Sequence, residues 1–143
     1  MPENVEDNAI ALATNLRQDY LELMNLQTLD IALFQDLRDS IGDDLIFSDI
    51  VTIYLSSAEN LIDEIQDAFN EQDADKFVIA THSLKSTSAS IGATRLAQIS
   101  RYLEKIGNTG EITVSADILN LLNDEYNEVI KAIQTLILAF MAQ

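Results

Sequence analysis

The chain has no cysteine and no tryptophan, and its 143 residues include only one proline, four glycines and one histidine. Without cysteine there is no disulfide bond, no thiolate metal site and no thiol nucleophile. A single histidine without cysteine also argues against a zinc site. Few glycines and prolines among many Ala, Leu, Ile, Asp and Glu residues favour helices over sheet. We therefore expect an all-α protein.

Positive charge is also scarce. Eight Lys and Arg residues face 24 Asp and Glu residues, which gives a net charge of −16. Such a surface repels nucleic acid and anionic lipid, so neither is an expected partner. The N-terminal stretch MPENVEDNAIALAT lacks the basic region of a signal peptide. The C-terminal apolar run LILAFMA is far shorter than the ~20 residues that span a bilayer. These features predict a cytoplasmic protein.

The chain shows no internal repeat, low-complexity tract or long linker, and its length suits one domain over residues 1–143. Apolar residues recur at helical spacing almost throughout. The expected helices span about 3–24, 28–41, 43–69, 73–92, 94–107 and 115–140. The last four would form an antiparallel four-helix bundle over 43–142, and additional N-terminal helices over 3–41 would pack against it.

The ends of these helices carry capping residues. Asp30 or Thr28 is expected to begin the second helix, and Gly42 to end it in a left-handed conformation. Asp73 or Asp75 is expected to start the fourth helix, and Thr94 and Ser115 are expected to cap the last two helices. The third helix should start at Asp43 or Asp44 and bury one stripe: Phe47, Ile50, Tyr54, Ala58, Leu61, Ile65 and Phe69.

The only histidine, His82, lies within the sequence THSLKSTSASIGA. The apolar residues of its helix fall within about 60° of one another on a helical projection, and His82 lies roughly opposite them. We therefore expect His82 to face solvent. Its neighbours on the helix at positions i+3, i+4 and i+7 are Lys85, Ser86 and Ala89. Ser86 and Ala89 would form a floor of small side chains that lets another protein approach the imidazole.

These residues suit phosphoryl transfer to nitrogen. A neutral imidazole is a competent nucleophile near pH 7. Lys85, one helical turn away, could stabilise the negative charge of the phosphoryl group. No glycine-rich nucleotide loop is present, so the phosphoryl group would come from another protein. A lone exposed histidine on a helix is usually only a surface residue, and the longer pattern around it decides the interpretation.

That pattern resembles the histidine-containing phosphotransfer (HPt) family, whose signature is a His, then Leu, Lys, Gly and small residues, then Gly-Ala. Here the segment reads His82-Ser-Leu-Lys-Ser-Thr-Ser-Ala-Ser-Ile-Gly-Ala93. Leu96 and Leu103-Glu104 also match downstream. Upstream, Gly42-Asp-Asp, Phe47 and the stretch from Tyr54 to Ala58 are similar to the first bundle helix of the family. The resemblance covers about Leu29 to Gly107 well and the last helix loosely.

The resemblance implies a monomeric relay carrier with no enzymatic activity, no cofactor and no metal of its own. Such proteins take a phosphoryl group from the receiver-domain aspartate of a hybrid sensor histidine kinase and pass it to a response regulator. By this resemblance His82 is the acceptor and Lys85 stabilises the phosphoryl group. One position departs from the family, because Ser86 stands where a glycine is usual. That glycine is associated with close approach of the partner, so the serine bears on transfer rate and partner preference.

The second helix carries two apolar stripes. Ile31, Phe34 and Ile41 form one, and Leu33 and Leu37 form another, displaced by roughly a quarter turn. Leu33 and Leu37 would either dock receiver domains, as the helix near the histidine does in the family, or be buried against the N-terminal helix. The sequence favours neither alternative over the other.

Two other functions compete with a phosphorelay carrier. A transfer-impaired helical adaptor would only bind receiver domains; Ser86 favours it, whereas the pair His82 and Lys85 argues against it. The phosphoacceptor portion of a sensor kinase is disfavoured by the absence of a nucleotide-binding segment. The acidic stretch from Glu71 to Asp75 lacks the glycine and terminal glutamate of an EF-hand at proper spacing, so a solvated turn is expected there.

Overall fold

The computed structural model describes residue 18 and residues 21–142. These residues contain five labelled helices and no strand: α2 (Ile31–Ile41), α3 (Asp44–Glu71), α4 (Ala74–Ile91), α5 (Thr94–Gly107) and α6 (Ala116–Met141). Residues 21–24 are also helical. Most of the predicted first helix, residues 3–17 and 19–20, lies outside the described residues. The expected all-helical class is confirmed.

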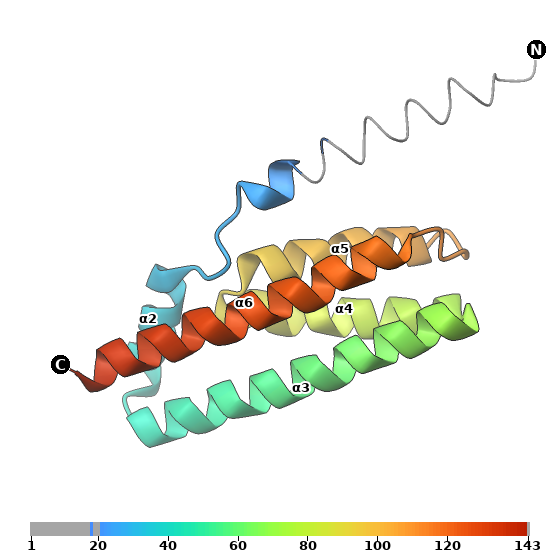
Figure 1. The fold of residues 1–143 in the computed structure, drawn as a ribbon. Coiled ribbons are helices and arrows are strands. Elements are labelled where there is room, and N and C mark those ends of the chain that lie inside the picture. Colours follow the sequence, from blue (N-terminus) through green and yellow to red (C-terminus); the bar gives the residue numbers. More distant parts are fainter. Residues whose placement is uncertain (1–17, 19–20, 143) are drawn as a thin grey trace, which may run out of the picture.

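Helices α3 to α6 run alternately up and down and form the bundle (Figure 1). Helix α2 lies across one end of it, where α3 begins and α6 ends. Aromatic contacts attach it there: the ring of Phe34 is 5.1 Å from that of Phe47 and 6.2 Å from that of Phe140. The guanidinium of Arg38 lies 4.2 Å from the centre of the Phe140 ring and pairs with Asp44 at 2.9 Å. Helix α2 therefore contacts the beginning of α3 and the end of α6, the first and last helices of the bundle.

The capping predictions were mostly correct. The side chains of Asp30, Asp43 and Asp73 each accept a hydrogen bond from a backbone N–H in the first turn of α2, α3 and α4. Gly42 ends α2 in the left-handed conformation. The prediction for Thr94 was wrong, because Ala93 takes the N-cap position and Thr94 is the first helical residue. Ser115 takes the N-cap position of α6, but its side chain makes no capping bond.

The buried face of α3 is displaced slightly from the predicted stripe. Ile50 was expected in the core, but it is 38% exposed. Leu61 and Phe69 are only partly buried and pack against the core. The face is completed instead by Val51 and Ile62, which lie in the core. The displacement arises because α4 and α6 contact α3 from two sides. The apolar periodicity of α3 alone does not reveal which of its residues these two helices cover.

By length and composition alone, α3 could cross a membrane; it is the one helix of the described residues that could. A single such helix is weak evidence for a membrane span, since core helices of bundles have the same character.

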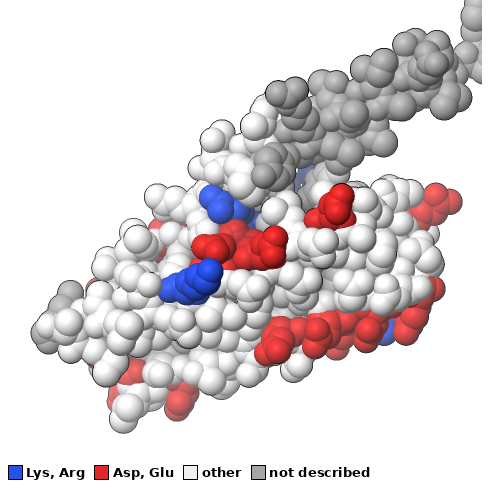
Figure 2. All heavy atoms as spheres, in the orientation of Figure 1, with Lys and Arg blue, Asp and Glu red and all other residues white. Residues whose placement is uncertain are grey.

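Figure 2 shows a row of acidic side chains along the lower edge of the molecule, over the second half of α3. The exposed acidic residues of that half are Glu59, Asp63, Glu64, Asp67 and Glu71.

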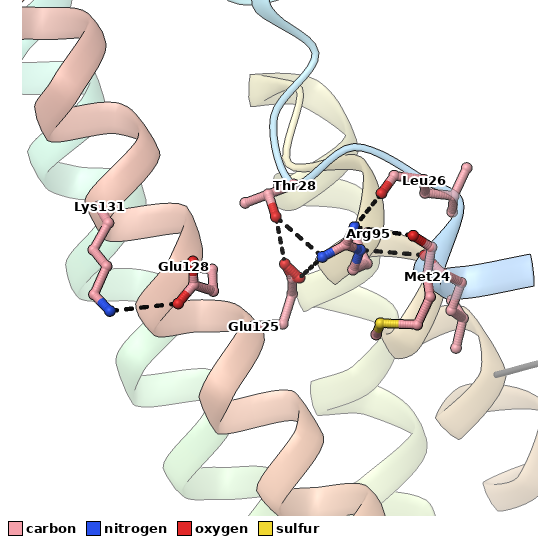
Figure 3. A network of polar contacts seen from close by, with 8 residues as sticks. Met24, Leu26, Thr28, Arg95, Glu125, Glu128 and Lys131 are labelled. Atoms are coloured by element: carbon pink, nitrogen blue, oxygen red, sulfur yellow. Dashed lines mark hydrogen bonds and ion pairs between the residues drawn. The ribbon is translucent and has the colours of Figure 1, made fainter. Parts of the chain in front are cut away.

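A partly buried polar cluster joins the segment before α2 to the bundle (Figure 3). Arg95 of α5 donates hydrogen bonds to the backbone carbonyls of residues 23, 24 and 26 and to the hydroxyl of Thr28. Its guanidinium also lies 3.5 Å from a carboxylate oxygen of Glu125 on α6. The Thr28 hydroxyl donates to the other oxygen of Glu125 at 2.8 Å. We call Thr28, Arg95 and Glu125 the Arg95 cluster.

Candidate functional site

Helix α4 presents His82 to solvent, as its sequence predicted. Phe77, Ala80, Leu84 and Ile91 are all in the core. The side chain of His82, on the opposite face, is 59% exposed. Thr81, directly before it, is buried, and its hydroxyl donates hydrogen bonds to backbone carbonyls of the preceding turn. The imidazole is therefore held on a rigid helix and is open to a partner.

A carboxylate from the neighbouring helix contacts this imidazole. Oε1 of Glu104, on α5, lies 2.9 Å from Nδ1 of His82. Its other oxygen, Oε2, lies 2.7 Å from Nζ of Lys85. The side chain of Glu104 is only 14% exposed, and that of Lys85 is 30% exposed. We call His82, Lys85 and Glu104 the His82 cluster.

The charge state of Glu104 determines what the imidazole can do. Burial raises the pKa of Glu104, but the hydrogen bonds and charges of Lys85 and His82 outweigh it, and the net shift of the pKa is downward. Glu104 is therefore ionised near neutral pH, and an ionised carboxylate only accepts hydrogen bonds. It follows that Nδ1 of His82 carries the proton and donates it. In the neutral ring, Nε2 then holds the free lone pair.

The surface beyond His82 along α4 is made of small side chains. Ser86 and Ala89 are both exposed, as the sequence predicted. Ser88, between them in sequence, is buried, and its hydroxyl lies 2.8 Å from the hydroxyl of Tyr54 on α3. Burial is the main cause that raises the pKa of Tyr54 to about 12. This buried contact places the first half of α3 beside the part of α4 that follows His82.

Helix α2 reaches the end of the same surface. Gly92 ends α4 with φ +91°, and a Cβ atom there would lie 3.1 Å from the carbonyl oxygen of Asp30 and 3.3 Å from the side chain of Leu33. Glycine is therefore needed for both the backbone conformation and the close approach of α2. Leu33 is 37% exposed, whereas Leu37 is partly buried and packs against the core. The two leucines that the sequence grouped together thus differ in environment.

Two features of this region were not anticipated from the sequence. The sequence indicated Glu104 only as part of the pattern Leu103-Glu104 and gave it no role. The periodicity of one helix cannot show that this side chain contacts His82 on a neighbouring helix. The second feature is an exposed apolar stripe on α3, in which Ile46, Ile50 and Ile53 are 52%, 38% and 68% exposed. Ile50 had been assigned to the core.

Within the described part of the chain, no group of three or more His, Cys, Asp or Glu side chains is arranged to hold a metal ion. The acidic stretch that was considered as a cation loop forms the turn between α3 and α4. There Asp73 caps α4 and Glu71 pairs with Lys76 at 3.4 Å.

Comparisons with known proteins agree on one family. The family model of the Hpt domain matches residues 49–132. Histidine-containing phosphotransfer protein B of Pseudomonas aeruginosa has a similar structure, with a TM-score of 0.73 and 19% identity over 80% of this chain and 98% of that one. The maize histidine-containing phosphotransfer protein has a TM-score of 0.68 and 20% identity, over 88% of this chain and 98% of its own. No curated protein matches the sequence. At these identities the structures show the shared fold.

Proposed function

Because the chain belongs to the Hpt domain family, whose model matches more than half of it, we propose that it is the phosphotransfer component of a multistep phosphorelay with His82 as the acceptor. Proteins of this family are relay carriers rather than classical enzymes, and their partners are receiver domains. His82 accepts a phosphoryl group from the receiver-domain aspartate of a hybrid sensor histidine kinase and passes it to a response regulator. The protein acts as a cytoplasmic monomer without a cofactor, and neither nucleic acid nor membrane is its partner.

The observation that supports this proposal best is the state of the imidazole. His82 is the only histidine in the chain, its side chain is 59% exposed, and its Nδ1 is held by Glu104 at 2.9 Å. Nε2 is then the unprotonated nitrogen of the neutral ring. An exposed nucleophile of fixed orientation is what transfer between two proteins requires, since the reacting atoms must approach to about 3–3.5 Å.

The transfer step involves no bound nucleotide. The lone pair of Nε2 forms a bond to phosphorus, the bond from phosphorus to the aspartyl oxygen breaks, and its electron pair leaves with the aspartate carboxylate. In the second transfer, a carboxylate oxygen of the response-regulator aspartate forms the bond to phosphorus, the N–P bond breaks, and its electron pair returns to Nε2. Lys85 lies one turn from His82, and an ammonium at this distance stabilises the charge on the phosphoryl oxygens.

The surroundings of His82 supply a receiver-docking face, which we define as Leu33, Ile50, Ile53, Ser86 and Ala89. The contact between Tyr54 and Ser88 joins the first half of α3 to this part of α4, and Ile50 and Ile53 are exposed apolar residues of that half. Leu33 lies against Gly92 at its far end. Exposed apolar side chains give a transient interface the anchors that a strongly acidic surface cannot provide. The side chains of Ser86 and Ala89 are small, so they leave room for a partner to approach the imidazole.

A phosphorylation experiment tests the proposal. The protein is incubated with a receiver domain that has been charged with acetyl phosphate, and acid-labile phosphate on the protein is measured. His82→Gln should abolish the label and keep the helix content, since an exposed polar substitution usually changes stability by under ~0.5 kcal/mol. Asn127→Gln, an exposed change on α6, is the matched control and should label normally. Full acid-labile labelling of His82→Gln would refute the assignment.

The same experiment separates the second candidate function, a helical adaptor that binds receivers without transfer. The observation that favours it is Ser86, which stands where the family usually has glycine. An adaptor would bind the receiver domain in a titration and yet acquire no label in the unaltered chain.

A further inference from the structure

A groove lies between α5 and the segment before α2. Its volume is about 560 Å³, and residues of both segments line it. The lining includes three charged and three apolar side chains: Glu22, Arg101, Lys105, Leu23, Leu26 and Ile106. We call these six residues the α5 groove. None of them belongs to the His82 cluster or to the receiver-docking face, so the groove is a separate surface of the molecule.

The two cations of the α5 groove differ from the other basic residues of the chain. Arg101 and Lys105 are exposed and lie one helical turn apart, on the same side of α5. Neither forms an ion pair within the part of the chain that the structure describes, whereas the other described basic side chains each pair with a carboxylate: Arg38, Lys76, Lys85, Arg95 and Lys131. The net charge of −16 repels acidic partners over most of the surface. The α5 groove is where two neighbouring cations attract one.

The floor of the groove is apolar and incompletely covered. Leu23, Leu26 and Ile106 are half-buried, and no residue that lines the groove is fully buried. Leu26 and Ile106 belong neither to the core nor to the residues packed against it. A half-covered apolar floor with a charged rim is the arrangement of a protein docking surface. Sites for small molecules instead enclose most of the surface of their ligand.

We propose that the α5 groove binds an acidic amphipathic segment of a partner protein. Its apolar side chains lie on Leu26 and Ile106, and its carboxylates pair with Arg101 and Lys105. A helix with apolar residues three or four apart, and Asp or Glu beside them, supplies both kinds of contact. This inference goes beyond the proposed function, because binding here needs no phosphoryl group. A partner held in the groove leaves His82 accessible to receiver domains.

Binding of a synthetic peptide to the full chain tests the proposal. The probe is a fluorescein-labelled helical peptide with Leu at every third or fourth position and Glu between them, and its control peptide has Gln in place of each Glu. Fluorescence anisotropy should show that the acidic peptide binds more tightly than the control. Added salt should weaken its binding, because salt screens exposed charges. No binding of the acidic peptide, or equal binding of both peptides, would overturn the proposal.

Charge reversal separates the groove from the overall charge of the chain. Arg101→Glu combined with Lys105→Glu should weaken binding of the acidic peptide by about tenfold or more, because two attractions become repulsions. Lys76→Glu combined with Lys131→Glu changes the net charge equally outside the groove and should have little effect. Glu22→Gln should act in the opposite direction and tighten binding by roughly two- to fivefold, since it removes a repelling carboxylate from the rim. Equal losses of affinity in the two double variants would contradict the proposal.

Amide chemical shifts identify where the peptide binds. In ¹⁵N-labelled protein the acidic peptide should shift the amides of Arg101, Lys105 and Ile106 and leave those of Ser86 and Ala89 in place. Sodium acetate at the same carboxylate concentration should not produce these shifts. Shifts of the same amides with acetate alone would indicate a site for small anions and would overturn the docking role.

A labelling experiment shows that the two surfaces are independent. The chain saturated with acidic peptide should take phosphate from a charged receiver domain at the same rate as the free chain. Loss of labelling caused by the peptide would overturn the separation of the groove from the receiver-docking face. A chain that binds the peptide at the groove and yet takes no label with or without it would contradict the proposed function alone and support the groove.

Discussion

The His82 cluster and the Arg95 cluster are built from similar groups and lie at different depths. In each, a carboxylate is shared between a basic side chain and a second hydrogen-bond donor. In the His82 cluster the pKa of Glu104 is lowered, because Lys85 and His82 outweigh the opposing effect of burial. In the Arg95 cluster the pKa of Glu125 is raised, because burial outweighs Thr28 and Arg95. The side chain of Glu125 is only 2% exposed, whereas that of Glu104 is 14% exposed.

The difference distinguishes the structural role of the Arg95 cluster from the role in transfer that we propose for the His82 cluster. In the Arg95 cluster, the polar groups of all three side chains are engaged by partners within the protein. The guanidinium binds backbone carbonyls of the segment before α2 as well as the carboxylate (Figure 3). In the His82 cluster, Nε2 of the histidine has no described hydrogen-bond partner, and the side chain is 59% exposed. Removal of a member should therefore lower the free energy of unfolding in the first case and slow the proposed transfer in the second.

The largest expected effect is on the Arg95 cluster. Arg95→Ala should destabilise the protein by about 3–5 kcal/mol, because it leaves the carboxylate of Glu125 buried without its cation. It also frees the carbonyls that hold the segment before α2. Chemical denaturation monitored by circular dichroism measures the loss, and Arg101→Ala, an exposed change on the same helix, is the control. A loss below ~1 kcal/mol would show that the cluster is not structural.

The next effect concerns Lys85. Removing a charge-stabilising contact costs ~10²-fold or more in rate in well-formed sites, and an exposed site shared with a partner should show less. Lys85→Ala should therefore slow transfer from a phosphorylated receiver by up to about 10²-fold, while Lys131→Ala, an exposed lysine of α6, leaves it unchanged. Rapid-quench kinetics with labelled phosphate measures both rates. An unaltered rate in Lys85→Ala would remove this lysine from the mechanism.

A smaller effect distinguishes the two leucines of α2. Leu37→Ala should lower the free energy of unfolding by about 2 kcal/mol, the low end for a buried leucine, because the side chain is only partly buried. Leu33→Ala should change stability less and weaken binding to a receiver domain more. A thermal melt beside a binding titration compares the pair. Normal affinity in folded Leu33→Ala would exclude Leu33 from the docking face.

The smallest effect is a contrast in pH dependence. Glu104, with its lowered pKa, contributes stability that is present above the ordinary value of 4.5 and is lost as the pH falls through its folded pKa. Glu125, with its raised pKa, does the reverse: the folded protein gains stability, relative to pH 7, as this carboxyl becomes protonated. Between pH 7 and pH 4, the stability of the unaltered protein should therefore fall relative to Glu104→Gln and rise relative to Glu125→Gln. Denaturant titrations at both pH values measure the slopes, and slopes of the same sign would contradict the contrast.

Much of this protein follows from local sequence. The few glycines and prolines and the helical spacing of apolar residues predict an all-α fold, because helix formation depends on residues three and four apart. The caps Asp30, Asp43 and Asp73 and the stop at Gly42 could be predicted for the same reason. The exposure of His82 followed from the apolar side of its own helix, and so did its small neighbours Ser86 and Ala89.

Other features depend on where helices meet, which no single-helix pattern contains. Glu104 is 22 residues from His82 and on another helix, so only the packing of α4 against α5 brings its carboxylate to Nδ1. The exposure of Ile50 likewise depends on where two neighbours leave α3 uncovered. The sequence alone thus indicated which residue we propose as the phosphoryl acceptor. The tertiary structure decided which of its ring nitrogens is free, because a hydrogen bond between distant residues exists only once the helices are packed.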